Sequence, residues 1–157
     1  MSVDVEIVEI QPQLGVQIRM HTSYEQLSDA FGEALGKLMS HLVSQGIGPE
    51  QFVGSFYAIY HSVDDPESWD YSIGIPVLTE VETNDDIQLH TLPGGRAAKT
   101  TLVGSYEGLK DQWEGLMVWL KQNKHTTVGD PWESYRISPP LETDPEKWET
   151  DIYWILQ

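Results

Sequence analysis

The stretch Thr22–Leu42, TSYEQLSDAFGEALGKLMSHL, reappears 82 residues later as Gly104–Lys124, GSYEGLKDQWEGLMVWLKQNK. Ser-Tyr-Glu is identical in the two stretches, and the apolar positions match, with Phe31 aligned on Trp113. The same offset also aligns the apolar residues that precede each stretch. Because self-similarity at a fixed spacing indicates a repeated structural unit, we predict two copies of one unit, about 1–79 and 85–157, within a single domain of residues 1–157.

Each copy has a readable local pattern. Apolar residues recur at i, i+3 and i+4 within both stretches, which predicts two amphipathic helices. Strand-like alternation precedes each helix, with a predicted hairpin turn at Pro93–Gly95, and two further apolar runs follow each helix. We therefore expect an α+β fold: a duplicated strand-helix-strand-strand unit, with about eight mostly antiparallel strands in all and two long helices on one face.

Charge and composition exclude several classes of protein. Nine Lys and Arg against 25 Asp and Glu give a formal net charge of -16, and the basic residues are scattered along the chain. A protein with this charge repels DNA phosphates and anionic membranes but attracts cations. The chain has no cysteine, no signal-like N-terminal region and no apolar run long enough to cross a bilayer. We expect a cytoplasmic protein with no nucleic-acid or membrane partner.

Motifs for metals and cofactors are missing from the sequence. The five histidines show no metal-ligand spacing, and neither a P-loop nor a dinucleotide-binding fingerprint occurs. We therefore predict no metal, no cofactor and no catalytic motif of a common type.

The repeat singles out one acidic residue. After a change in loop length, YAIY at Tyr57–Tyr60 aligns with WESY at Trp132–Tyr135, which sets Ala58 against Glu133. Side chains alternate between the faces of a strand, so Glu133 shares its face with Tyr135. A small apolar residue in one copy is thus a carboxylate in the other, and such a break in symmetry is expected of a binding site.

A structural interpretation of the same residues stays open at this point. A glutamate in a strand is more often exposed to water or paired with a cation, here Arg136 or Lys99. The aromatic residues could be ordinary core. If they instead line a cleft, their rings and one negative charge suit a flat cationic or polarisable ligand. The candidate binding residues are Glu133, Tyr135, Tyr60, Trp113 and Trp154.

Two further segments carry a resemblance to a known family. WDYSIGIPV at Trp69–Val77 and PWESY with TDPEKWETDIYWI within Pro131–Ile155 resemble the GyrI-like small-molecule-binding family, the effector-binding domain of AraC-type and MerR-type multidrug regulators. The resemblance covers essentially the whole chain. It implies that Glu133 stands where the family commonly has a glutamate that contacts cationic aromatic ligands.

The resemblance implies a binding protein and leaves two alternatives. The expected function is to bind hydrophobic, cationic or amphipathic small molecules in a cleft between the two repeats, without the helix-turn-helix module that regulators of this family carry. One alternative is a hydrolase that opens strained cyclopropane-bearing compounds with Glu133 as the base. The other is a gyrase-inhibitor-like protein that contacts a topoisomerase. If Glu133 waits for a ligand, its replacement by glutamine should leave stability nearly unchanged.

Overall fold

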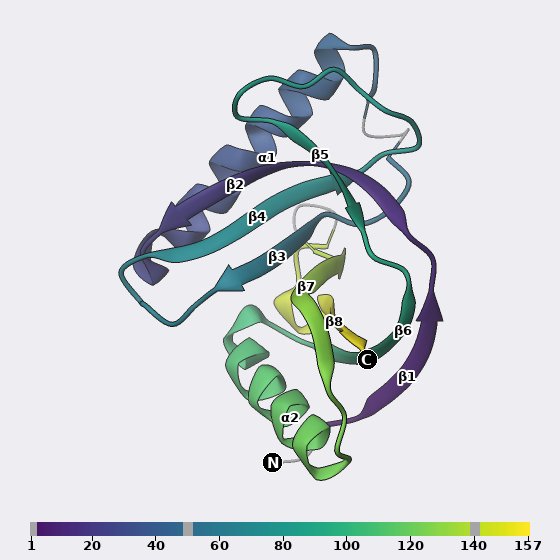
Figure 1. Cartoon of the computed structure of the whole chain (residues 1–157). Coiled ribbons are helices and arrows are strands. Elements are labelled where there is room, and N and C mark those ends of the chain that lie inside the picture. The colour runs from purple at the N-terminus through teal and green to yellow at the C-terminus, as the bar shows by residue number, and fades with distance from the viewer. Residues whose placement is uncertain (1–2, 49–51, 139–141) are drawn as a thin grey trace. The chain divides into compact units, whose positions relative to one another are not determined.

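The chain forms two compact units (Figure 1). The computed structural model describes residues 3–48, 52–138 and 142–157. The central unit is Pro12–Leu92, and the terminal unit combines Met1–Gln11 with Pro93–Gln157. Within the described residues each unit contains four strands and one long helix.

The central unit is an antiparallel sheet with strand order β5-β2-β4-β3. Helix α1 packs against β2 and β4, which lie in the middle of the sheet. The bounds are β2 Gln13–Thr22, α1 Leu27–Ser44, β3 Tyr57–Ser62, β4 Trp69–Pro76 and β5 Gln88–Leu92, with a short 3-10 turn, η1 Tyr24–Gln26, before α1.

The terminal unit has the matching order β1-β6-β8-β7, again antiparallel. Helix α2 packs on this sheet and follows its own 3-10 turn. The bounds are β1 Val5–Ile10, β6 Gly95–Val103, η3 Tyr106–Gly108, α2 Leu109–Gln122, β7 Thr127–Ile137, η4 Pro145–Lys147 and β8 Glu149–Leu156.

The strands of the two units pair in equivalent registers. In the central unit Ile18 lies opposite Ile73. Moving 82 residues on from the first and 79 from the second gives Thr100 and Ile152, which lie opposite each other in the terminal unit. The predicted α+β fold of a duplicated unit, with eight antiparallel strands and two long helices, is therefore confirmed.

The hairpin predicted at Pro93–Gly95 is wrong. Gly15 on β2 lies opposite His90 on β5, and Val8 on β1 lies opposite Ala97 on β6. The first strand of each repeat thus pairs with the second strand of the other repeat, and the segments around Pro12 and Pro93 connect one unit to the other instead of turning a hairpin. Alternating apolar residues identify a strand but not its partner, because either pairing buries the same face.

Each helix buries one apolar stripe against its own sheet. The stripe of α1 faces the core of the central unit, and α1 ends as predicted before Gly46, which has φ 81°. The stripe of α2 does the same in the terminal unit, where it contacts residues of β6 and β8. That both helices lie on one face of a common sheet stays a prediction. The buried stripe residues are Ala30, Ala34, Leu38 and Leu42 in α1, and Gly115, Leu116 and Leu120 in α2.

On the opposite face of the central sheet, a tyrosine lies across two glycines. The ring of Tyr57 occupies the space where a Cβ on Gly15 or Gly74 would stand. Its hydroxyl donates to Gln17 Oε1 at 2.9 Å, and burial raises its pKa above the ordinary value for tyrosine. The two glycines on neighbouring strands therefore provide the space that this buried ring needs.

We predict that Gly74→Ala destabilises the protein by roughly 1–3 kcal/mol, because the new methyl group overlaps a buried ring that a hydrogen bond holds in place. Urea denaturation monitored by circular dichroism measures this. Gly32→Ala in α1 is the control, since an added Cβ there meets no atom within 4 Å. A helical glycine changed to alanine should stabilise by about 0.5–1 kcal/mol. Equal effects of the two substitutions would show that Tyr57 moves aside freely.

Candidate functional site

Glu133 is a buried carboxylate on β7. The residue is 2% exposed, and its strand pairs with β8. The indole Nε1 of Trp113, on α2, donates to Glu133 Oε2 at 2.6 Å, and the hydroxyl of Tyr135 donates to Oε1 at 2.7 Å. A carboxylate is expensive to bury unless donors surround it, and short bonds to a charged acceptor are strong ones. The helix and the strand thus hold this group in a fixed orientation.

Glu133 is buried, and the two cations considered as its partners both contact other carboxylates. Arg136 binds Asp151 through Nε at 2.9 Å, and Lys99 Nζ lies 3.9 Å from Glu6 Oε1. Arg136 therefore reaches the other face of the sheet, because Asp151 lies opposite Ser134, the residue next to Glu133.

Three more aromatic contacts and one hydrogen bond extend from the two donors. Tyr135 meets Tyr106 edge to face at 5.9 Å between ring centroids, and Tyr106 stacks on Trp148 at 4.8 Å. On the other side Trp113 meets Trp154 at 6.4 Å, and the Trp154 indole donates to the Gly129 carbonyl at 3.0 Å. Such edge and stacked arrangements are the geometries that aromatic rings prefer. Four of the predicted site residues therefore lie in the terminal unit: Glu133, Tyr135, Trp113 and Trp154. Hydrogen bonds join the first three.

Tyr106 and Trp148 were not among the predicted site residues. Burial raises the pKa of Tyr106, and the negative charge of Glu133 raises it further, so its phenol stays protonated and neutral. The sequence offered a signal for these two residues, because the aligned positions of the first repeat also hold a tyrosine and a tryptophan. Tyr24 and Trp69, their equivalents in the first copy, also contact each other, at 5.1 Å between ring centroids.

Tyr60 lies in the central unit. Its ring contacts Trp69 at 6.0 Å and Tyr71 at 6.5 Å. Its predicted meeting with Glu133 stays a prediction.

The register supports the comparison of Glu133 with Ala58. Ala58 lies opposite Ile73 on β4, and Glu133 lies opposite Ile152 on β8. These two isoleucines are the equivalent residues identified above from the β2–β4 and β6–β8 ladders. The first repeat thus has a buried methyl group where the second has a carboxylate, and the phenyl ring of Phe31 where the second has an indole donor.

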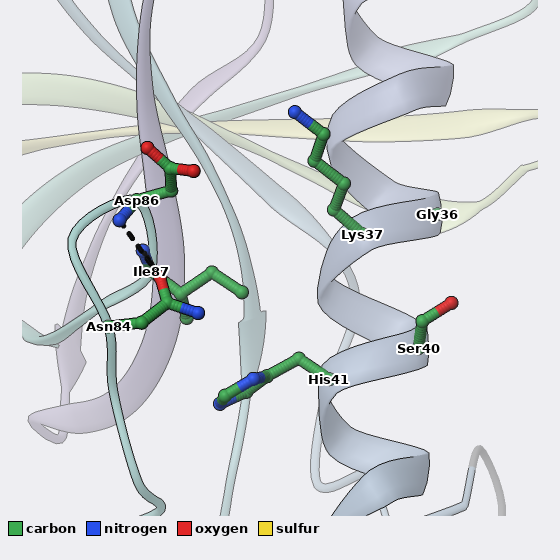
Figure 2. A pocket seen from close by; sticks show the side chains of 7 residues that line it. All are labelled: Gly36, Lys37, Ser40, His41, Asn84, Asp86 and Ile87. Atoms are coloured by element: carbon green, nitrogen blue, oxygen red, sulfur yellow. Dashed lines mark hydrogen bonds between the residues drawn. The ribbon is translucent and has the colours of Figure 1, made fainter.

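A separate depression lies on the central unit (Figure 2). It has a volume of about 610 Å³ and lies between α1 and the segment before β5. Asn84 Oδ1 accepts from the backbone N–H groups of Asp86 and Ile87, so this amide shapes the turn. The lining residues are Gly36, Lys37, Ser40, His41, Asn84, Asp86 and Ile87. None of the predicted site residues is among them.

Within residues 3–48, 52–138 and 142–157, no three His, Asp or Glu side chains gather as a metal site would require. No helix in the same ranges is long and apolar enough to cross a membrane.

Three solved structures resemble the chain over nearly its whole length. The C-terminal domain of EcmrR has a TM-score of 0.79 at 19% identity, covering 100% of this chain and 99% of that one. SAV2435 bound to tetraphenylphosphonium has a TM-score of 0.64 at 13% identity, with coverage of 98% and 94%. A hydrolase from Listeria innocua has a TM-score of 0.65 at 10% identity, with coverage of 99% and 93%. At these identities the similarity establishes the fold alone.

The sequence itself also has a family match. No curated protein matches the chain. The model of the GyrI-like small molecule binding domain, however, matches residues 3–157. Because this family match covers almost every residue, the chain belongs to the GyrI-like small-molecule-binding domain family.

Proposed function

We propose that this domain binds hydrophobic organic cations, with the Glu133 carboxylate as the recognition charge and the aromatic rings around it as the walls. The observation that carries the proposal is the buried carboxylate held by Trp113 and Tyr135. A negative charge set among aromatic faces favours a ligand that is both positively charged and apolar, because the rings and the carboxylate attract the same cation. Trp154 completes the wall on the Trp113 side.

The overall charge and one structural relative support this ligand class. The formal net charge of -16 raises the local concentration of cations and repels anions, including nucleic-acid phosphates. SAV2435 was solved bound to tetraphenylphosphonium, which is a lipophilic aromatic cation. A cytoplasmic location, with no nucleic-acid or membrane partner, is part of the same proposal.

Hydrolysis with Glu133 as a base is the second candidate, and the hydrogen bonds weigh against it. A base that activates water needs a carboxylate oxygen directed at that water and a separate donor directed at the substrate. Here the Tyr135 hydroxyl donates to the carboxylate itself, and so does the Trp113 indole. Both carboxylate oxygens accept hydrogen bonds from the protein itself, an arrangement that suits the recognition of charge better than the activation of water.

The binding test uses two probes of similar shape. Methyltriphenylphosphonium carries a positive charge, whereas triphenylphosphine oxide is neutral and has the same three phenyl rings. We expect Glu133→Gln to weaken the cation at least tenfold, about 1.4 kcal/mol, and the neutral oxide much less. Isothermal titration calorimetry well below the unfolding temperature measures both affinities.

The control for that experiment is Glu107→Gln, which removes one negative charge from an exposed residue of the same unit. It should change neither affinity by more than about twofold, since exposed charges are screened by water and salt. If both glutamine variants weaken the cation equally, the effect is one of net charge and Glu133 is not the site. Product formation from a cyclopropane-bearing substrate that stops in Glu133→Gln would favour the hydrolase instead.

The geometry changes the expectation for stability. Both oxygens of Glu133 accept a hydrogen bond, whereas the amide of glutamine offers only one oxygen. One donor therefore loses its acceptor in Glu133→Gln. We now expect a loss of roughly 1–3 kcal/mol, where the sequence suggested almost none.

A double-mutant cycle between Trp113 and Glu133 measures their coupling. Trp113→Phe and Glu133→Ala together recreate the pair that the first repeat has in Phe31 and Ala58. Because the double variant leaves no unmatched indole facing a carboxylate, it should be less destabilised than the sum of the single variants, by about 1.5–3 kcal/mol. Urea denaturation of the four proteins gives this value. Additive losses would mean that the short contact contributes no net stability.

A further inference from the structure

Thr150 on β8 carries a buried hydroxyl with no hydrogen-bond partner. The residue is 0% exposed, and its Oγ1 is the buried side-chain oxygen or nitrogen within the described ranges that lacks any partner. Buried polar groups are nearly always hydrogen-bonded, so an exception needs a reason. One such reason is that the hydroxyl serves to bind a ligand.

The position of Thr150 puts it beside the carboxylate. Side chains alternate along a strand, so Thr150 projects from the same face of β8 as Ile152, which packs in the core against α2. Glu133 lies opposite Ile152. Thr150 is therefore the diagonal neighbour of Glu133, at a typical spacing of about 7–8 Å between such positions. One aromatic ligand can span that distance.

The first repeat shows what normally fills this place. Met20 lies opposite Tyr71 in the central unit, and in the terminal unit the equivalent pair is Leu102 and Thr150. The ring of Tyr71 stacks on Phe31 with centroids 6.0 Å apart. In the second repeat a threonine replaces that ring.

The partner of the tyrosine is replaced as well. The hydroxyl of Tyr71 shares a 2.8 Å hydrogen bond with Thr22. The equivalent of Thr22 is Gly104, which has no side chain and lies at φ 129°. The second repeat has thus lost both the ring and the group that satisfied its hydroxyl, while it has gained the carboxylate and the indole.

We propose that Thr150 is a specificity-determining residue of the Glu133 site, whose hydroxyl bonds a polar substituent on an aromatic cation. This rests on the proposed function. The ligand class becomes narrower: a hydrophobic cation that carries an alcohol, carbonyl or amine at the far end of one ring from its charge. The hydroxyl can donate one hydrogen bond and accept two, so all three groups suit it.

The test compares two cations that differ at one group. (4-Hydroxymethylphenyl)triphenylphosphonium ends in an alcohol, and (4-ethylphenyl)triphenylphosphonium has a methyl group in its place. The wild-type protein should prefer the alcohol about fivefold. In Thr150→Val, which keeps the shape and removes the hydroxyl, the alcohol should bind about fivefold more weakly and the ethyl probe should change less than twofold. Thr150→Ser, which keeps the hydroxyl, should keep the preference.

Thermal unfolding without ligand supplies the second measurement. Removal of an unsatisfied buried hydroxyl should leave the melting temperature of Thr150→Val unchanged or raise it by about 2–4 °C. A fall of several degrees would mean that the hydroxyl already has a structural partner, and an equal loss of both probes in Thr150→Val would remove its role in specificity. Either result overturns the proposal. Failure of the proposed function looks different, because the ethyl probe would then bind wild type and Glu133→Gln alike.

Discussion

Pairing between the first strand of one repeat and the second strand of the other is the constraint on which the rest of the structure depends. The β1–β6 and β2–β5 ladders have equivalent registers, and each adds an edge strand that completes a four-stranded sheet. Register decides which side chains face a helix, because a shift of one residue sends every side chain to the other face. The carboxylate can therefore meet the indole of α2 only because the ladders through β6 and β8 hold their register.

Within that common frame, the second repeat differs from the first at a few neighbouring positions. Ala58 is replaced by Glu133 and Phe31 by Trp113, and the two new side chains bond each other. Tyr71 is replaced by Thr150, whose hydroxyl has no partner. The changes all lie on the face that packs against the helix, so this side of one unit acquires polar chemistry while its counterpart remains apolar core.

The sequence predicted the fold and most of the carboxylate's surroundings, and failed where information about partners was needed. The repeat placed Glu133 on the face of Tyr135 and against Ala58, because strand alternation and helix periodicity depend on neighbours along one chain. It could not choose between hairpin and exchanged pairing, since both bury the residues of β1 and β5 equally well. The sequence also could not show that the Thr150 hydroxyl lacks a hydrogen-bond partner, because this depends on every atom around the hydroxyl. The hydrogen bond from Trp113 to Glu133 was predicted only in part. Helix spacing assigned the Trp113 ring to the core, but it gave no partner for the indole N–H.

Strand exchange also bears on how such a chain could arise. A single repeat of this kind has a first strand that cannot pair with its own second strand in the observed way, so two separate copies would complete their sheets only by trading strands across a symmetric dimer. In such a dimer every substitution appears twice. Joining the copies into one polypeptide removes that obligation, since each half can then mutate alone. A buried charge, which is costly to hold, then needs to be present only once, and the other half can keep an apolar core at the same position.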